Sequence, residues 1–127
     1  MKKYLLAIAL CSSSLYANVY FYPFDRLPYI ERNFYNIKYM CSEKWEADSY
    51  DVVFLNSFIS KGTVFSKFDS QSVRVLIELY DKAVYIDSHG IASIDLSSGK
   101  KVDISSFMKY RDSIVSKIIP CREWREY

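Results

Sequence analysis

Few side chains in this sequence have the chemistry for catalysis, and the one histidine, His89, is the first to consider. Any mechanism that uses a histidine base must pass through it. His89 follows Asp87 and Ser88, but a catalytic triad is assembled by geometry from separate elements. Asp-Ser-His-Gly is also typical of a tight turn, because Asp and Ser bond to nearby backbone and Gly accepts a positive φ. We interpret residues 87–90 as a turn and keep a functional His89 as the weaker alternative.

Two carboxylates offer a second kind of chemistry. Glu43 and Glu46 lie on either side of Trp45, and glycoside hydrolysis needs two acids at the correct separation. With 15 acidic residues in the chain, such pairs also arise by chance. The sequence has no Gly-rich phosphate loop and no GxSxG elbow, and its cysteines have no neighbouring histidines for a zinc site. We predict no catalytic residue, no metal and no cofactor, and keep a small cell-wall-active hydrolase as an alternative.

Aromatic residues are concentrated early in the chain. Tyrosine combines a large apolar ring with a polar hydroxyl, which suits a surface that alternates between water and a partner. We predict a binding surface that includes Tyr35, Tyr39 and Trp45, with Trp124 of the C-terminal tail as a further candidate. The alternative is that these rings pack the core of a small domain. Residues 18–50 contain Tyr20, Phe21, Tyr22, Phe24, Tyr29, Phe34, Tyr35, Tyr39, Trp45 and Tyr50.

The first 17 residues have the three parts of a secretory signal peptide. Lys2 and Lys3 form a basic start, residues 4–11 are an unbroken apolar run, and Ala17 is a small residue at the expected cleavage site. The apolar run is too short to span a bilayer, which takes about 20 residues. We predict export to the periplasm or the cell exterior, with residues 1–17 removed and no transmembrane segment in the mature chain.

This leader has two alternative interpretations. Cys11 could carry a lipid anchor, but the residue before such a cysteine is normally small, and here it is Leu10. Residues 1–17 could also be a buried helix of a cytosolic protein. We prefer the signal peptide to both.

The charge balance argues against nucleic acid as a partner. The chain has 17 Lys and Arg against 15 Asp and Glu, and loss of Lys2 and Lys3 with the leader makes the two counts equal. A nucleic-acid binder needs a basic stripe that neutralises phosphates, and none is present. Residues 18–127 match the size of one globular domain, and half of all residues are apolar.

The cysteines predict one disulfide. After the leader is removed, Cys41 and Cys121 remain, and an oxidising compartment favours their only intramolecular pairing. Free buried thiols are the alternative.

Hydrophobic patterns predict an α+β fold. Alternation and turn residues indicate an antiparallel meander over 73–104, and a helical period indicates a C-terminal helix over 105–119. Two earlier segments, 27–37 and 50–60, also have helical spacing, although each could instead contain a strand. We expect one small antiparallel sheet of three to five strands, with two or three helices on one face.

These features together predict a small exported binding protein without enzymatic activity. An inhibitor or immunity-type protein of the cell envelope fits best, with another protein in the envelope or outside the cell as partner. A glycan-binding or small-ligand-binding domain is a further alternative to the hydrolase.

Overall fold

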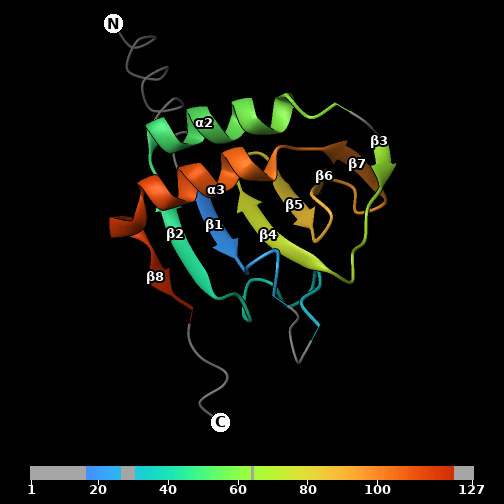
Figure 1. Ribbon diagram of the computed structural model, residues 1–127, viewed down its shortest axis with the longest axis horizontal. Helices are drawn as coiled ribbons and strands as arrows, with labels where there is room; N and C mark the ends of the chain where they lie inside the picture. Colours follow the sequence, from blue (N-terminus) through green and yellow to red (C-terminus); the bar gives the residue numbers. More distant parts are fainter. Residues whose placement is uncertain (1–16, 27–30, 64, 122–127) are drawn as a thin grey trace, which may run out of the picture.

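The structure is a computed structural model that describes residues 17–26, 31–63 and 65–121. In these residues, one antiparallel sheet of eight strands carries two α-helices, α2 (Ser49–Ser60) and α3 (Ile104–Ser113), and a short 3₁₀ helix, η1 (Val115–Lys117). The sheet order is β3-β7-β6-β5-β4-β1-β2-β8 (Figure 1). Neither α-helix is long and apolar enough to cross a membrane. The strands are β1 (Ala17–Phe21), β2 (Glu43–Ala47), β3 (Phe65–Lys67), β4 (Val73–Glu78), β5 (Ala83–Asp87), β6 (Ile91–Ser93), β7 (Ser98–Lys101) and β8 (Ile119–Pro120).

The predicted sheet of three to five strands with two or three helices is wrong, because the sheet has eight strands. Strands β4 to β7 do form a meander of neighbours, but β1, β2 and β8 extend the sheet beyond β4. β2 went unpredicted because only Trp45 and Ala47 of its five residues are buried, and charged residues obscure the alternation. The predicted helix 105–119 is also too long, since α3 ends at Ser113 and residues 119–120 pair with β2.

The helix predicted over 27–37 is absent from its described part, since residues 31–33 have no regular secondary structure and residues 34–37 form turns. Asn33 and Asn36 account for this. The Asn33 Oδ1 atom accepts hydrogen bonds from the backbone N–H groups of Tyr35 and Asn36, at 2.9 and 3.1 Å, and Asn36 Oδ1 accepts from Asn33 N at 2.9 Å. Asparagine side chains that bond to nearby backbone compete with helix formation. Residues 27–30 lie outside the described residues.

The helix predicted over 50–60 is confirmed as α2. Its N-cap is Asp48, whose side chain accepts from the backbone N–H of Asp51, while the Asp51 carboxylate accepts from Asp48 N. This reciprocal capping box fixes where the helix starts.

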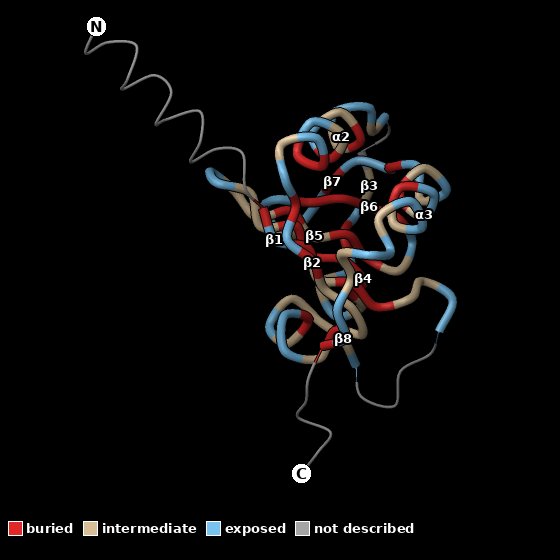
Figure 2. Tube along the Cα trace, turned by 90° about the vertical axis from the view of Figure 1, so that its left-hand side faces the viewer, coloured by how far each residue is buried: buried red, intermediate tan, exposed pale blue. Residues whose placement is uncertain are grey.

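Helices α2 and α3 cover one face of the sheet (Figure 2). The core on this face is centred on Phe107 of α3, which is fully buried. Its ring centroid lies 5.9 Å from that of Phe21, 6.2 Å from that of Trp45 and 5.6 Å from that of Phe58. The Trp45 indole N–H donates to the Tyr110 hydroxyl at 3.0 Å, so the one polar atom of the Trp45 side chain is also satisfied.

The opposite face is covered by irregular chain. Its smaller core contains Tyr22, Ile37, Phe68 and Leu76, with Val73 and Ile91 beside them. Backbone hydrogen bonds attach the covering segment, since Val73 N donates to the Arg32 carbonyl at 2.7 Å. The predicted disulfide is confirmed: Cys41 and Cys121 are bonded, with their Cα atoms 5.7 Å apart. The bond joins the covering segment to the chain just after β8.

Candidate binding surface

Residues 31–42, called the tyrosine loop from here on, display two of the predicted binding residues. Tyr35 is 75% exposed and Tyr39 is 69% exposed. The loop backbone beneath them is held in place, because Ile37 is fully buried in the core and Cys41 is bonded to Cys121. Exposed rings on a fixed backbone form a surface that loses little conformational entropy when a partner binds.

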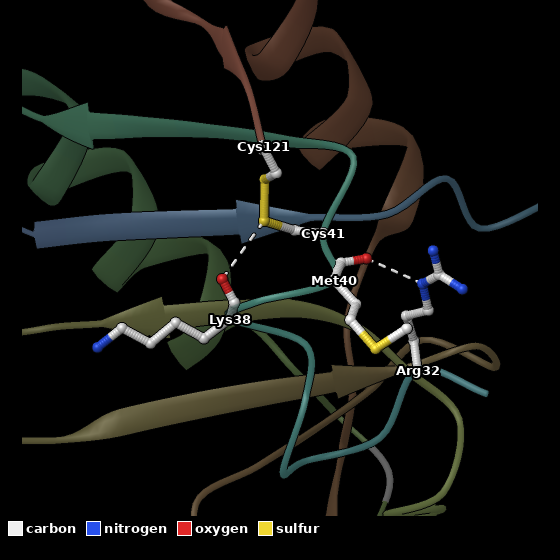
Figure 3. Close-up of a disulfide and its surroundings, with 5 residues drawn as sticks. All are labelled: Arg32, Lys38, Met40, Cys41 and Cys121. Carbon is white, nitrogen blue, oxygen red and sulfur yellow. Dashed lines mark hydrogen bonds between the residues drawn. A yellow bond between two sulfur atoms is a disulfide. The ribbon is translucent and has the colours of Figure 1, made fainter. Parts of the chain in front are cut away.

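The disulfide end of the loop is held by further backbone contacts. Ser42 N donates to the Phe21 carbonyl at 2.8 Å, and Cys121 N donates to the Ser42 carbonyl at 3.1 Å. Arg32 Nε donates to the Met40 carbonyl at 2.9 Å and so closes the loop upon itself (Figure 3). Cys41 Sγ lies 3.6 Å from the Lys38 carbonyl oxygen, which is a contact only, because a disulfide sulfur has no proton to donate.

Tyr39 stands beside a polar cluster. Lys38 Nζ lies 3.0 Å from Glu78 Oε2, and the Tyr20 hydroxyl donates to Glu78 Oε1 at 3.2 Å. Burial, and then the Glu78 charge, raise the pKa of Tyr20 above its ordinary value. The hydrogen bond to Glu78 raises the pKa of Lys38. The surface around Tyr39 therefore combines an exposed ring with paired charges, which resembles the polar rim of a protein–protein interface.

Tyr35 is supported from below. Its ring stacks on that of Phe34 with centroids 4.5 Å apart, and Phe34 packs in turn against the core of this face. A ring stacked on a partly buried neighbour presents its other face outward. Tyr35 and Tyr39 are thus the two predicted residues that lie together on one loop.

The other two predicted residues have different positions. Trp45 is 3% exposed and belongs to the core under the helices, because the alternation of β2 turns it inward with Ala47. Its side chain therefore offers no accessible surface. Trp124 lies outside the described residues.

The carboxylate pair considered for hydrolysis is not assembled. Residues 43 and 46 of one strand point to opposite faces of the sheet. Glu43 accepts from Arg111 Nε at 2.9 Å in an ion pair, whereas Glu46 is exposed. Trp45 is buried and cannot serve as a platform for a sugar ring.

His89 lies in the predicted turn and is exposed. The neighbouring Asp87 is fully buried and its carboxylate is satisfied by backbone: Oδ1 accepts from His89 N and Ile91 N, and Oδ2 accepts from Asp69 N, at 2.9 to 3.0 Å. Asp87 therefore organises the turn through backbone hydrogen bonds. No group of three or more potential metal ligands exists within the described part of the chain.

A groove between α2 and strands β5 to β7 is a second candidate site, which the sequence did not indicate because its walls come from distant segments. It encloses about 810 Å³, within the range of small-molecule sites. Gly99 sits in one wall, where a Cβ atom would lie 2.0 Å from the Ala92 carbonyl oxygen, so only glycine allows β7 to approach β6 this closely. The wall residues include Asn56, Ile59, Lys82, Val84, Ile94 and Lys100.

Comparison of this chain with protein-family models, curated proteins and solved structures found no match.

Proposed function

We propose that this chain is a small exported binding protein without enzymatic activity, and that its tyrosine loop docks on another protein. An inhibitor or immunity-type role in the envelope or outside the cell is the form that we favour. The observation that carries the proposal is the display of Tyr35 and Tyr39, 75% and 69% exposed, on a loop held by a disulfide. Export is supported by the leader pattern of residues 1–17, and the disulfide is consistent with an oxidising compartment.

Tyrosine suits this role for an energetic reason. Its side chain brings a large contact area with only two rotatable angles, so little entropy is lost on binding. Truncation of an aromatic residue at the centre of an interface often weakens binding by more than about tenfold. The two loop tyrosines are therefore the residues that we expect to dominate affinity.

The test is a cross-linking pull-down from the native envelope with the oxidised protein as bait. The matched variants are Tyr35→Ala with Tyr39→Ala on the loop, and Tyr50→Ala on α2, where the ring is 86% exposed on a different surface. We expect one protein to be enriched by the wild type and by Tyr50→Ala, and lost with the loop double variant. Equal enrichment by all three baits would reject the tyrosine loop as the docking site.

The groove beside α2 favours a second candidate function, the binding of a glycan or another small ligand. Its volume and its mixture of apolar wall and lysine side chains support this alternative. Asn56→Trp would fill the groove from the exposed side of α2. Saturable binding of wall fragments that this variant abolishes and the loop double variant retains would support the groove over the loop.

A further inference from the structure

Three arginines converge on one tyrosine ring on the loop-covered face. The guanidinium carbons of Arg26, Arg32 and Arg74 lie 5.7, 4.4 and 5.6 Å from the centroid of the Tyr22 ring. Each contact is individually favourable, because the face of an aromatic ring attracts cations. Three like charges around a single ring also repel one another, and the ring carries no net charge to offset them.

Arg74 is the most unusual member, because it is only 4% exposed. The sequence alternation places it on a solvent face of β4, but the β-bulge between Val73 and Val75 and the cover above this face bury it. Its Nε atom is buried and has no hydrogen-bond partner among the residues that the structure describes. The one hydrogen bond found there for the guanidinium runs from Nη2 to the Arg26 carbonyl, at a long 3.4 Å. A buried charge with so few partners is costly to fold.

Nearby carboxylates do not balance this charge. Asp69 and Asp87 are the acids that act on Arg74 electrostatically, and both Asp87 oxygens accept from backbone N–H groups. Within the described ranges, neither Arg26 nor Arg74 has a carboxylate at ion-pair distance. Burial, and then the Arg32 charge, lower the pKa of Arg74, yet a guanidinium stays protonated in proteins. Deprotonation therefore does not relieve the imbalance, and an anion from outside the chain would.

We propose that Arg26, Arg32 and Arg74 form a binding site for a small oxyanion, that is, a carboxylate, sulfate or phosphate group. Planar guanidinium groups match such anions through paired N–H donors. Arg26 is exposed and gives access from solvent, while Arg74 supplies the buried unpartnered donor. The site goes beyond the proposed function, since a free ion can occupy it without any protein partner.

The experiment is an NMR titration of the oxidised protein that follows the Arg74 Nε–H signal. Sodium acetate, sulfate and phosphate are added separately, with sodium chloride keeping the ionic strength constant. We expect a saturable shift of the Arg74 signal. Comparable affinities for the three ions would indicate general oxyanion binding, whereas stronger binding of sulfate and phosphate would indicate a site for tetrahedral dianions, and stronger binding of acetate a carboxylate site.

Two variants with the same change of net charge make the test specific. Arg26→Gln removes an exposed member of the cluster and should weaken binding about tenfold, as expected for a charge-assisted contact. Lys109→Gln removes an exposed charge from α3, on the other face of the sheet, and should leave affinity unchanged. The proposal is overturned if no ion gives a saturable shift in the wild type, or if both variants bind as the wild type does.

Discussion

The two faces of this sheet are built in different ways. The helix-covered face is apolar and regular: Val19 and Phe21 of β1 point to it, and Phe107 fills its centre. The loop-covered face receives Tyr20 and Tyr22 from the same chain segment, together with a buried arginine and an irregular loop. One stretch of alternating residues thus supplies a packed core on one side and tyrosines on the other. The first face holds the larger apolar core, and the second carries the proposed binding surface.

The two faces also hold their covers by different forces. Helix α3 attaches to the sheet through aromatic packing, because the Phe107 ring lies 5.9 Å from that of Phe21 and 6.2 Å from that of Trp45. Helix α2 packs on α3 through the stacked rings of Phe54 and Tyr110, 4.5 Å apart. The tyrosine loop attaches through backbone hydrogen bonds and the Cys41–Cys121 bond. We therefore expect the position of the tyrosine loop to depend more on the disulfide than the positions of the helices do.

Removal of the disulfide should have the largest effect on the loop-covered face. The bond closes a chain separation of 80 residues, worth about 4.5 kcal/mol in the chain-entropy model. Cys41→Ser and Cys121→Ser should each lower the free energy of unfolding by a similar amount, and the double variant by no more than either. Denaturant titrations measure this, and hydrogen exchange should show the tyrosine loop opening before the helices. Unequal losses would contradict the account of a single shared bond.

Truncation of Phe107 should have the largest effect on the helix-covered face. Phe107→Ala leaves a cavity among five neighbouring rings and should cost about 4 kcal/mol; these rings belong to Phe21, Phe24, Trp45, Phe58 and Tyr110. Phe34→Ala makes the same chemical change on the loop-covered face, where the ring is only partly buried, and should cost less than half as much. Both values come from chemical denaturation. Equal costs would remove the energetic distinction between the faces.

Replacement of Arg74 tests whether the loop-covered face keeps a charge at the expense of stability. Arg74→Met retains most of the side-chain volume and removes an under-bonded buried guanidinium. Such replacements are often neutral or stabilising, so we expect a change between zero and a gain of about 1 kcal/mol in the free energy of unfolding. A loss above about 2 kcal/mol would show that the guanidinium stabilises the fold through its contacts with Tyr22.

The smallest effect concerns pH and the start of α2. The hydrogen bond from Lys117 Nζ, and then that from Asp51 N, hold the pKa of Asp48 at about 2, below its ordinary 3.8. A lowered carboxylate pKa in the folded state stabilises the protein above pH 4, and this contribution disappears as the pH falls from 4 to 2. Asp48→Asn should make the unfolding midpoint less dependent on pH in that range. Lys117→Gln should have the same effect. If the double variant lost the pH dependence by the sum of the two single effects, Asp48 and Lys117 would not act through one shared interaction.

The predictable parts of the fold are those set by local pattern. Helix α2 follows from its apolar spacing, and the meander β4 to β7 from alternation and turn residues. The disulfide pairing follows from elimination, because Cys41 and Cys121 are the two cysteines outside the predicted leader, which contains Cys11. These features need no knowledge of distant contacts.

The remaining features depend on contacts between distant segments. β2 is a strand because β1 and β8 pair with it, although three of its five residues are charged. Residues 31–37 have helical spacing, but the side chains of Asn33 and Asn36 accept hydrogen bonds from nearby backbone N–H groups and so compete with a helix. Arg74 alternates as a surface residue, and only the bulge and the cover above it explain its burial. In the candidate site, Tyr35 and Tyr39 come from an argument about aromatic residue type that also selected Trp45, which is buried. The arginine cluster joins segments almost 50 residues apart, so no local pattern indicates it.

Site-specific photo-cross-linking in the native cell tests whether the tyrosine loop contacts a partner protein. A photoreactive phenylalanine analogue replaces Tyr39 in one strain and Tyr50 in another, since both positions are exposed but lie on different surfaces. We predict a discrete protein adduct from position 39, lost when Cys41 and Cys121 are both replaced by serine, and none from position 50. The same adduct from both positions, or an adduct from position 50 alone, would contradict the assignment of binding to the tyrosine loop.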